Sequence, residues 1–405
     1  MKRFFYTDLT KPKLNPANFF LVFFCLHVFL NFILLFFTKG SYLSEIVWNA
    51  RFAPDGFDFF SPITRSLRPY DNQVFYPPFC MFLYWILGHI IPVVIKDSDV
   101  TNWWRLFADI TMHCCMCIIA FFTYKSLRRK SSLYILSFLL CFICSHAFGF
   151  AELHSHNSCI WALCFLVPAL YLKDSDNPRY REVALVFIAI AANIKLTPAV
   201  FGLIYLKEKR FKEAFRLVIY GLVLFLVPMF LFGGFKILKT IFQVTNDFSF
   251  SFTQPRPETI NGVCLFISDY LGLGVSGNLI GKIATILYFL TVILLICLTK
   301  FDYKSMTLLC SFNVILVNHS YPYTLIYFLP AMILFIKEVS VKFNLLDYLY
   351  GALFVLVFAS YPFLKINWPT ATFITNYFWL YIFVFLLAIE KIMNVANVEK
   401  TKKSR

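Results

Sequence analysis

The sequence predicts an all-α integral membrane protein that crosses the bilayer about twelve times. Hydrophobic residues make up 60% of the chain and charged residues only 15%, against about 25% charged residues in a soluble domain. The charged residues are also clustered between long apolar runs. The first run, residues 19–37, contains no Asp, Glu, Lys or Arg, and a membrane-spanning helix needs roughly 20 apolar residues.

The apolar runs give the order of the expected spans. The first run is too long for a typical signal-peptide core and no clear small-residue cleavage site follows it, so we expect a retained span. The other spans are predicted near residues 76–95, 104–124, 132–150, 158–172, 182–204, 215–233, 279–298, 305–318, 321–337, 345–363 and 371–391. They predict one membrane domain over residues 19–391, between cytoplasmic tails 1–18 and 392–405.

Basic residues set the expected orientation. The formal charge of +15 fits Lys and Arg at cytoplasmic ends of spans, and no aromatic–basic module of the kind that binds nucleic acid is present. Both tails are basic, so both are expected in the cytoplasm. The expected location of the chain is the plasma or inner membrane. Loops 38–75 and 234–278 then face the exterior.

One basic group conflicts with this arrangement. The group at residues 125–130 would lie outside, against the positive-inside rule. Two irregular or re-entrant segments would remove the conflict, and residues 182–204 are one candidate because Lys195 and Pro198 interrupt them. Proline frees a backbone carbonyl and a buried lysine is costly, so we expect a broken helix or one that faces a cavity.

The exterior loop 38–75 contains the first candidate for chemistry. Asp58 lies between phenylalanines that we expect to dock at the membrane interface and to fix its position. A fixed, partly desolvated carboxylate is suited to act as a general base. A solvated loop acid or a helix cap is the alternative, and Asp55 and Glu45 are nearby competitors.

Two arginines and a proline pair follow in the same region. Arg65 and Arg68 are suited to bind a phosphate at the interface, or they extend to the interface as ordinary basic side chains do. Tyr76-Pro77-Pro78 begins the second span. Proline is tolerated in a first helical turn, so this motif is expected to fix where the loop rejoins the membrane.

Further candidates lie later in the chain. A lysine within an apolar run is a functional hypothesis by default, and an anionic lipid phosphate is a natural partner for Lys195; a lysine that reaches the interface is the alternative. The polar cluster 152–157 ends in Asn157. Its side chains are of the kind that bind a sugar hydroxyl or a metal, and a plain loop is the alternative. His319 precedes Tyr321 in another polar stretch.

The cysteines and histidines do not predict a metal or disulfide framework. The twelve cysteines lie almost entirely in apolar segments. The cluster at residues 113–117 resembles a metal site, but on a helix its side chains point in different directions, so we expect packing and no metal. Asp109 and His113 are four residues apart and share one helix face, where we expect them to satisfy each other inside the bundle.

The order of these motifs resembles glycosyltransferase family 87 over roughly residues 15–340. These are polytopic GT-C enzymes that include polyprenyl-phosphomannose-dependent α-1,2-mannosyltransferases. Asp58 looks like the catalytic aspartate of the family, and Tyr76-Pro77-Pro78 looks like its Tyr-Pro-Pro motif. The matching elements that follow are Lys195 and Pro198 in a Lys-x-x-Pro element, and His319 and Tyr321 in a late polar loop. The family often has Gly-Gln-x-Asn before its fifth span, and here only Asn157 fits.

The resemblance implies a GT-C-type helical bundle and a hexosyltransferase activity. A mannose-like hexose would pass with inversion from a polyprenyl-phosphate donor to a hydroxyl of a lipid-linked or glycan acceptor, in cell-envelope glycan synthesis. Asp58 would act as the general base, while Lys195 with Arg65 or Arg68 would neutralise the leaving phosphate. Tyr76, Asn157, His319 and Tyr321 would contact substrate, and no cofactor is implied.

Two other functions remain open from the residues. A transporter or flippase of a lipid-linked saccharide would also need buried cations, but it gives no reason for an acid fixed in an exterior loop. A polysaccharide polymerase or ligase shares the lipid-phosphate chemistry and would use a whole oligosaccharide donor.

Overall fold

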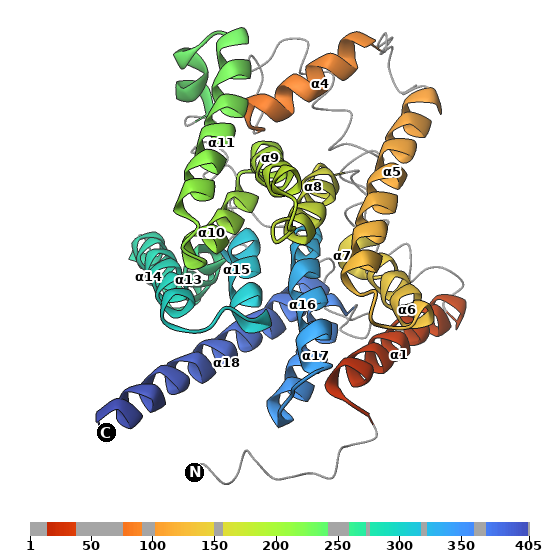
Figure 1. The fold of residues 1–405 in the computed structure, drawn as a ribbon, viewed down its shortest axis with the longest axis vertical. Coiled ribbons are helices and arrows are strands. Elements are labelled where there is room, and N and C mark those ends of the chain that lie inside the picture. The colour runs from red at the N-terminus through yellow and green to blue at the C-terminus, as the bar shows by residue number, and fades with distance from the viewer. Residues whose placement is uncertain are drawn as a thin grey trace. The chain divides into compact units, whose positions relative to one another are not determined.

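The computed structural model describes residues 14–37, 76–90, 102–149, 157–241, 259–272, 276–316, 322–359 and 370–403. Within these residues the regular structure is entirely helical, as the sequence predicts (Figure 1). Contacts along the chain define two compact units. Unit 1 comprises Met1–Asn49, Thr123–Gly149 and Arg256–Arg405, and unit 2 comprises Ala50–Phe122 and Phe150–Pro255.

Five of the described helices are long and apolar enough to cross a membrane. They contain the segments Pro16–Ile33, Phe107–Ser126, Phe211–Leu231, Leu279–Leu298 and Thr375–Ala396. Only 22–28% of each segment is buried within the protein, so most of their apolar side chains face outwards, as a lipid-exposed helix requires. The predicted count of about twelve spans is not confirmed, because shorter apolar helices such as Cys159–Leu172 extend only about 21 Å.

Unit 2 is built around a tightly packed helix pair, which Figure 1 shows side by side. Its elements are α4 (Pro78–Ile90), α5 (Asn102–Ser126, whose last residues belong to unit 1), α8 (Cys159–Leu172), α9 (Pro178–Ile194), η2 (Thr197–Gly202), α10 (Leu203–Lys207) and α11 (Phe211–Leu231). Small buried residues, Ala169 on α8 and Ala184 and Ala189 on α9, let the backbones of the pair approach closely. Tyr205 and Leu217 extend this core to α10 and α11.

The predicted interruption of residues 182–204 is present, and it makes the segment a hairpin. The α-helix α9 ends at Ile194, and η2 and α10 carry the chain back along it. The return is fixed at the base, where Lys173 Nζ lies 2.6 Å from Glu208 Oε1 and an Arg210 guanidinium nitrogen donates to the Lys173 carbonyl at 2.9 Å. The single span predicted at 182–204 is therefore replaced by two arms that begin and end on the same side.

The base of this hairpin is a charged end of unit 2. The α8–α9 turn and the α10–α11 turn meet there, and α5 also reaches it, because the Phe122 and Tyr171 rings lie 5.5 Å apart. Arg210 donates hydrogen bonds to the Glu213 carboxylate, and this pairing raises the pKa of the Arg210 guanidinium above its ordinary value. Lys125 follows Phe122 by three residues on α5, in the part of this helix that belongs to unit 1.

Unit 1 contains the remaining helices around an aromatic core. They are α1 (Pro16–Phe37), α6 (Ser132–Ile143), α7 (His146–Gly149), α13 (Ile260–Tyr270), α14 (Ser276–Leu298), α15 (Tyr303–Ile315), η3 (Pro322–Phe328), α16 (Leu329–Val339), α17 (Leu345–Phe358) and α18 (Thr370–Lys403). Phe20 of α1 contacts Phe335 of α16 and Phe354 of α17, with ring centroids 5.7 and 6.2 Å apart. Phe354 contacts Phe383 of α18 at 4.7 Å.

A buried ionic network ties α18 to the other helices of unit 1. Lys304 Nζ lies 2.5 Å from Glu390 Oε1 and 3.8 Å from Asp347 Oδ1. The Tyr350 hydroxyl donates to Glu390 at 2.6 Å and the Tyr303 hydroxyl donates to Asp347 at 2.5 Å. Each buried charge is thus paired and hydrogen-bonded, which is the condition under which burial of an ion pair is tolerated.

Candidate functional site

Lys195 stands at the tip of the hairpin, where α9 stops. Pro198 has no N–H to donate to the carbonyl of Ile194, so an α-helix cannot continue through it. Lys195 takes an extended conformation, with φ −136° and ψ 129°, and its own N–H still bonds the Ala191 carbonyl at 3.0 Å. Its positive charge therefore lies at the C-terminal end of a helix, where the helix dipole favours a cation.

The ammonium group of Lys195 lies over an aromatic ring. Its Nζ is 4.6 Å from the centroid of the Tyr76 ring, within the range of about 6 Å in which a cation is attracted to a ring face. Both side chains are half-buried. Among the described residues no carboxylate lies within ion-pair distance of Lys195 Nζ. The structure thus joins two residues that the sequence singled out independently.

The Tyr76-Pro77-Pro78 motif explains why the ring is held there. The residue before a proline is restricted to extended conformations, and Pro78 forms the first residue of α4, where its missing N–H is not needed. Pro77 and Pro78 are buried, and the Pro77 carbonyl accepts a hydrogen bond from Met81 N at 3.0 Å. The motif is therefore a rigid helix start, as predicted.

Aromatic contacts connect this ring to the start of α8. The Tyr76 ring lies 5.5 Å from that of Tyr84, which is fully buried, and Tyr84 lies 5.3 Å from Trp161. Cys80 lies between Tyr76 and Tyr84 in the chain and is buried on α4. The faces of α4, α8 and α9 at this end of unit 2 therefore meet around the lysine.

Asn157 lies in the same region and is buried. Its side-chain oxygen accepts a hydrogen bond from Cys159 N at 2.9 Å, which orders the turn that enters α8. This contact gives the residue a structural role in the described chain. Its use as a sugar ligand stays a prediction.

Asn193 is a further polar residue of this region, which the sequence analysis did not single out. Its side-chain nitrogen donates to the Ala189 carbonyl at 2.9 Å and to the Gly221 carbonyl on α11 at 3.1 Å. The side chain is buried. It ties the last turn of α9 to α11 two residues before Lys195, and so fixes the direction in which the tip of the hairpin leaves the helix.

Several predicted site residues lie outside the described residues. They are Asp58, Arg65, Arg68, His319 and Tyr321. Their roles as base, phosphate ligands and substrate ligands stay predictions.

The polar residues of α5 do not gather into a site. His113 Nδ1 lies 2.6 Å from the backbone carbonyl of Asp109, and both side chains are exposed rather than inside the bundle. Cys115 is half-buried, Cys114 and Cys117 are exposed, and all three are free cysteines. In the part of the chain that the structure describes, no group of three or more His, Cys, Asp and Glu residues is arranged to hold a metal.

The spacing of the residues carried a signal for part of this cluster. Tyr76, Cys80 and Tyr84 recur every four residues, which places side chains on one helix face, and Asn157 and Trp161 have the same spacing. The contact between Tyr76 and Lys195 had no such signal, because the two residues are far apart in the chain.

The model of glycosyltransferase family 87 matches residues 75–318, which is more than half of the chain. The match includes Tyr76, Asn157 and Lys195 and begins after Asp58. No curated protein and no solved structure matches the chain.

Proposed function

The chain belongs to glycosyltransferase family 87, and we propose that it transfers a mannose-like hexose from a polyprenyl-phosphate sugar to a hydroxyl of a lipid-linked or glycan acceptor. A glycosyltransferase of this family has a sugar donor and an acceptor and works in a membrane setting. The catalytic domain is proposed to cover residues 19–391, with cytoplasmic tails on both sides.

The reaction is proposed to occur on the exterior side of the plasma or inner membrane. The charged end of unit 2 carries eight basic and five acidic residues between residues 173 and 216, with Lys195 left out, and an excess of basic residues is typical of the cytoplasmic side. Lys195 and Tyr76 lie at the opposite end of α9. The helix of 17 residues separates the two ends by about 25 Å.

One displacement accounts for the chemistry. Asp58 takes the proton of the acceptor hydroxyl as its oxygen attacks the anomeric carbon of the donor sugar. The new carbon–oxygen bond forms as the bond to the phosphate oxygen breaks, so the configuration inverts and polyprenyl phosphate leaves. A positioned general base contributes about 10²–10⁴ in rate.

Positive charge on the protein stabilises the leaving group. Lys195, with Arg65 or Arg68, neutralises the charge that grows on the phosphate as the bond breaks, which is the electrostatic stabilisation that most enzymes use. Tyr76, Asn157, His319 and Tyr321 contact the substrates in this proposal, and no cofactor takes part.

The observation that carries the proposal is the environment of the Lys195 ammonium group. A lysine within an apolar segment is costly unless something offsets its charge, and within the described residues a ring face lies against it rather than a carboxylate. A ring face does not neutralise the positive charge, and the N–H donors that point away from the ring are left for a phosphate. A lysine that served only to pair inside the bundle would be expected to meet an acid, as Lys304 meets Glu390.

The test is transfer by the purified full-length protein from a polyprenyl-phosphate mannose to an acceptor glycan, followed by mass spectrometry of the product. Asp58→Asn is expected to lower turnover by about 10²–10⁴ while the protein still binds donor. Asp55→Asn is the matched control and should keep most of the activity. Full turnover by Asp58→Asn would remove Asp58 from the mechanism, and donor movement across vesicles without transfer would favour a flippase.

A further inference from the structure

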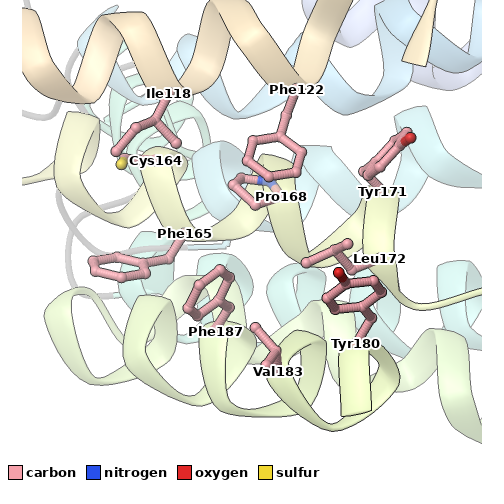
Figure 2. Close-up of a pocket in the computed structure, with 10 residues that line it drawn as sticks. All are labelled: Ile118, Phe122, Cys164, Phe165, Pro168, Tyr171, Leu172, Tyr180, Val183 and Phe187. Carbon is pink, nitrogen blue, oxygen red and sulfur yellow. The ribbon is translucent and has the colours of Figure 1, made fainter. Parts of the chain in front are cut away.

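A cavity of about 590 Å³ lies at the charged end of unit 2, away from Lys195. Figure 2 shows it between three helices, with α5 on one side, α8 along its length and α9 opposite. Its lining residues are Ile118, Phe122, Cys164, Phe165, Pro168, Tyr171, Leu172, Tyr180, Val183 and Phe187. The volume is within the about 300–1,000 Å³ that is typical of ligand sites.

The walls of the cavity are apolar because almost all of the lining side chains are aliphatic or aromatic. Pro168 lies within α8 and cannot donate to the carbonyl of Cys164, so the helix is weakened where both residues line the cavity. Phe165 and Phe187 contact each other across α8 and α9, with ring centroids 5.4 Å apart. The α5 wall belongs to a helix long and apolar enough to cross a membrane. An apolar chain is therefore the kind of ligand that the walls fit.

One end of the cavity is amphipathic. Tyr171 and Tyr180 are 38% and 52% exposed, and Figure 2 shows them at the same end of the cavity. Tyrosine has an apolar ring and a polar hydroxyl, and it is enriched where a bilayer meets water. This end is the expected level of lipid headgroups.

A cation lies next to Tyr180 in the chain. Arg179 immediately precedes Tyr180 and is exposed, and among the described residues it makes no ion pair. Two neighbouring cations at this end are already neutralised, Lys173 by Glu208 at 2.6 Å and Arg216 by Glu182 at 2.7 Å. Arg179 is thus a charge that remains for an anion.

We propose that this cavity binds one acyl chain of an anionic phospholipid, with its phosphate at Arg179. The apolar walls take the chain, the tyrosines mark the headgroup level, and the excess of basic residues at this end complements the negative charge. The site is distinct from the proposed donor site, because Tyr180 and Ile194 lie fourteen residues apart on α9, or about 21 Å. The inference does not depend on the proposed transfer reaction.

The experiment measures lipid retained by the full-length protein. Purified, delipidated protein is incubated with an equimolar mixture of phosphatidylglycerol and phosphatidylcholine of the same acyl chains, and bound lipid is counted by native mass spectrometry. One phosphatidylglycerol per chain is expected in preference to phosphatidylcholine. Arg179→Gln should weaken its retention about fivefold, the effect of about one basic side chain near an anionic lipid.

Separate variants test the headgroup and the cavity. Lys212→Gln removes an exposed cation at the same end that does not line the cavity, and it should leave retention unchanged. Val183→Phe and Ile118→Phe fill the cavity from opposite walls, and each should lower retention while Arg179 is intact. Far-ultraviolet circular dichroism of the lipid-free variants checks that they fold, and two walls are tested so that a failure of one is not decisive.

Three results would each overturn the proposal. Equal retention of the two lipids would remove the selectivity for an anion. Undiminished retention by both folded cavity-filling variants would show that the chain lies elsewhere. An equal loss in Lys212→Gln and Arg179→Gln would show a diffuse surface charge rather than a site.

Discussion

The contact between Lys195 and Tyr76 makes a sharp prediction about the ring. Tyr76→Leu removes the π face over which Nζ lies at 4.6 Å but keeps a smaller apolar side chain. Tyr76→Phe keeps the face and removes only the hydroxyl. If the ring holds the ammonium group for the donor phosphate, the two variants should differ strongly in the transfer reaction.

The size of the difference follows from the geometry. A cation over a ring face contributes about 0.5–1 kcal/mol at exposed sites and about 2 kcal/mol when desolvated. Both groups are half-buried, so we expect about 1–2 kcal/mol. This corresponds to a loss of roughly 5- to 30-fold in kcat/KM for Tyr76→Leu, at 1.36 kcal/mol for each factor of ten. For Tyr76→Phe we expect a loss of less than about threefold, since phenylalanine retains the interaction in weaker form.

The assay is the steady-state rate of sugar transfer at several donor concentrations, with the protein in one detergent throughout. The melting temperature of each variant is measured in the same detergent, so that loss of fold is separated from loss of catalysis. Tyr270→Leu is a suitable control because Tyr270 is 84% exposed and lies in unit 1. Equal kcat/KM for Tyr76→Leu and Tyr76→Phe would refute the role of the ring face.

Two further predictions concern unit 1. Lys304→Met leaves the carboxylates of Glu390 and Asp347, at 2.5 and 3.8 Å, without their cation, and is expected to destabilise the protein by about 3–5 kcal/mol; an unchanged melting temperature would contradict this. Gly281→Ala adds a Cβ that would lie 3.0 Å from the Cα of Asn261, so α14 must move away from α13. We expect the free energy of unfolding, measured in a denaturation curve, to fall by about 1–3 kcal/mol. An unchanged curve would contradict this prediction.

The sequence predicted local events better than it predicted spans. The break at Lys195 could be predicted because a lysine and a proline lie within one turn of each other in an apolar run. The count of crossings could not, because an apolar run of the length of residues 182–204 does not distinguish one long helix from a hairpin of α9, η2 and α10. Helix α8 is likewise apolar throughout, yet its 14 residues extend only about 21 Å, which is less than a bilayer core of about 30 Å.

The site was predicted as a set of residues but not as an arrangement. Tyr76, Asn157 and Lys195 were each singled out by their own local chemistry. Their meeting depends on how α4, α8 and α9 pack, which is a tertiary property that one sequence without homologues does not encode in any short motif. The proposed base, Asp58, lies outside the described residues.

The length of α9 sets the position of Lys195. Its base is pinned by Lys173, Glu208 and Arg210, and its tip carries Lys195. The number of residues between the base and the tip therefore sets how far the ammonium group lies from the base and in which direction around the helix axis it points. One residue added to α9 would raise the tip by about 1.5 Å and turn it by about 100°, away from the Tyr76 ring. The length of this helix is thus as much a part of the site as the lysine itself.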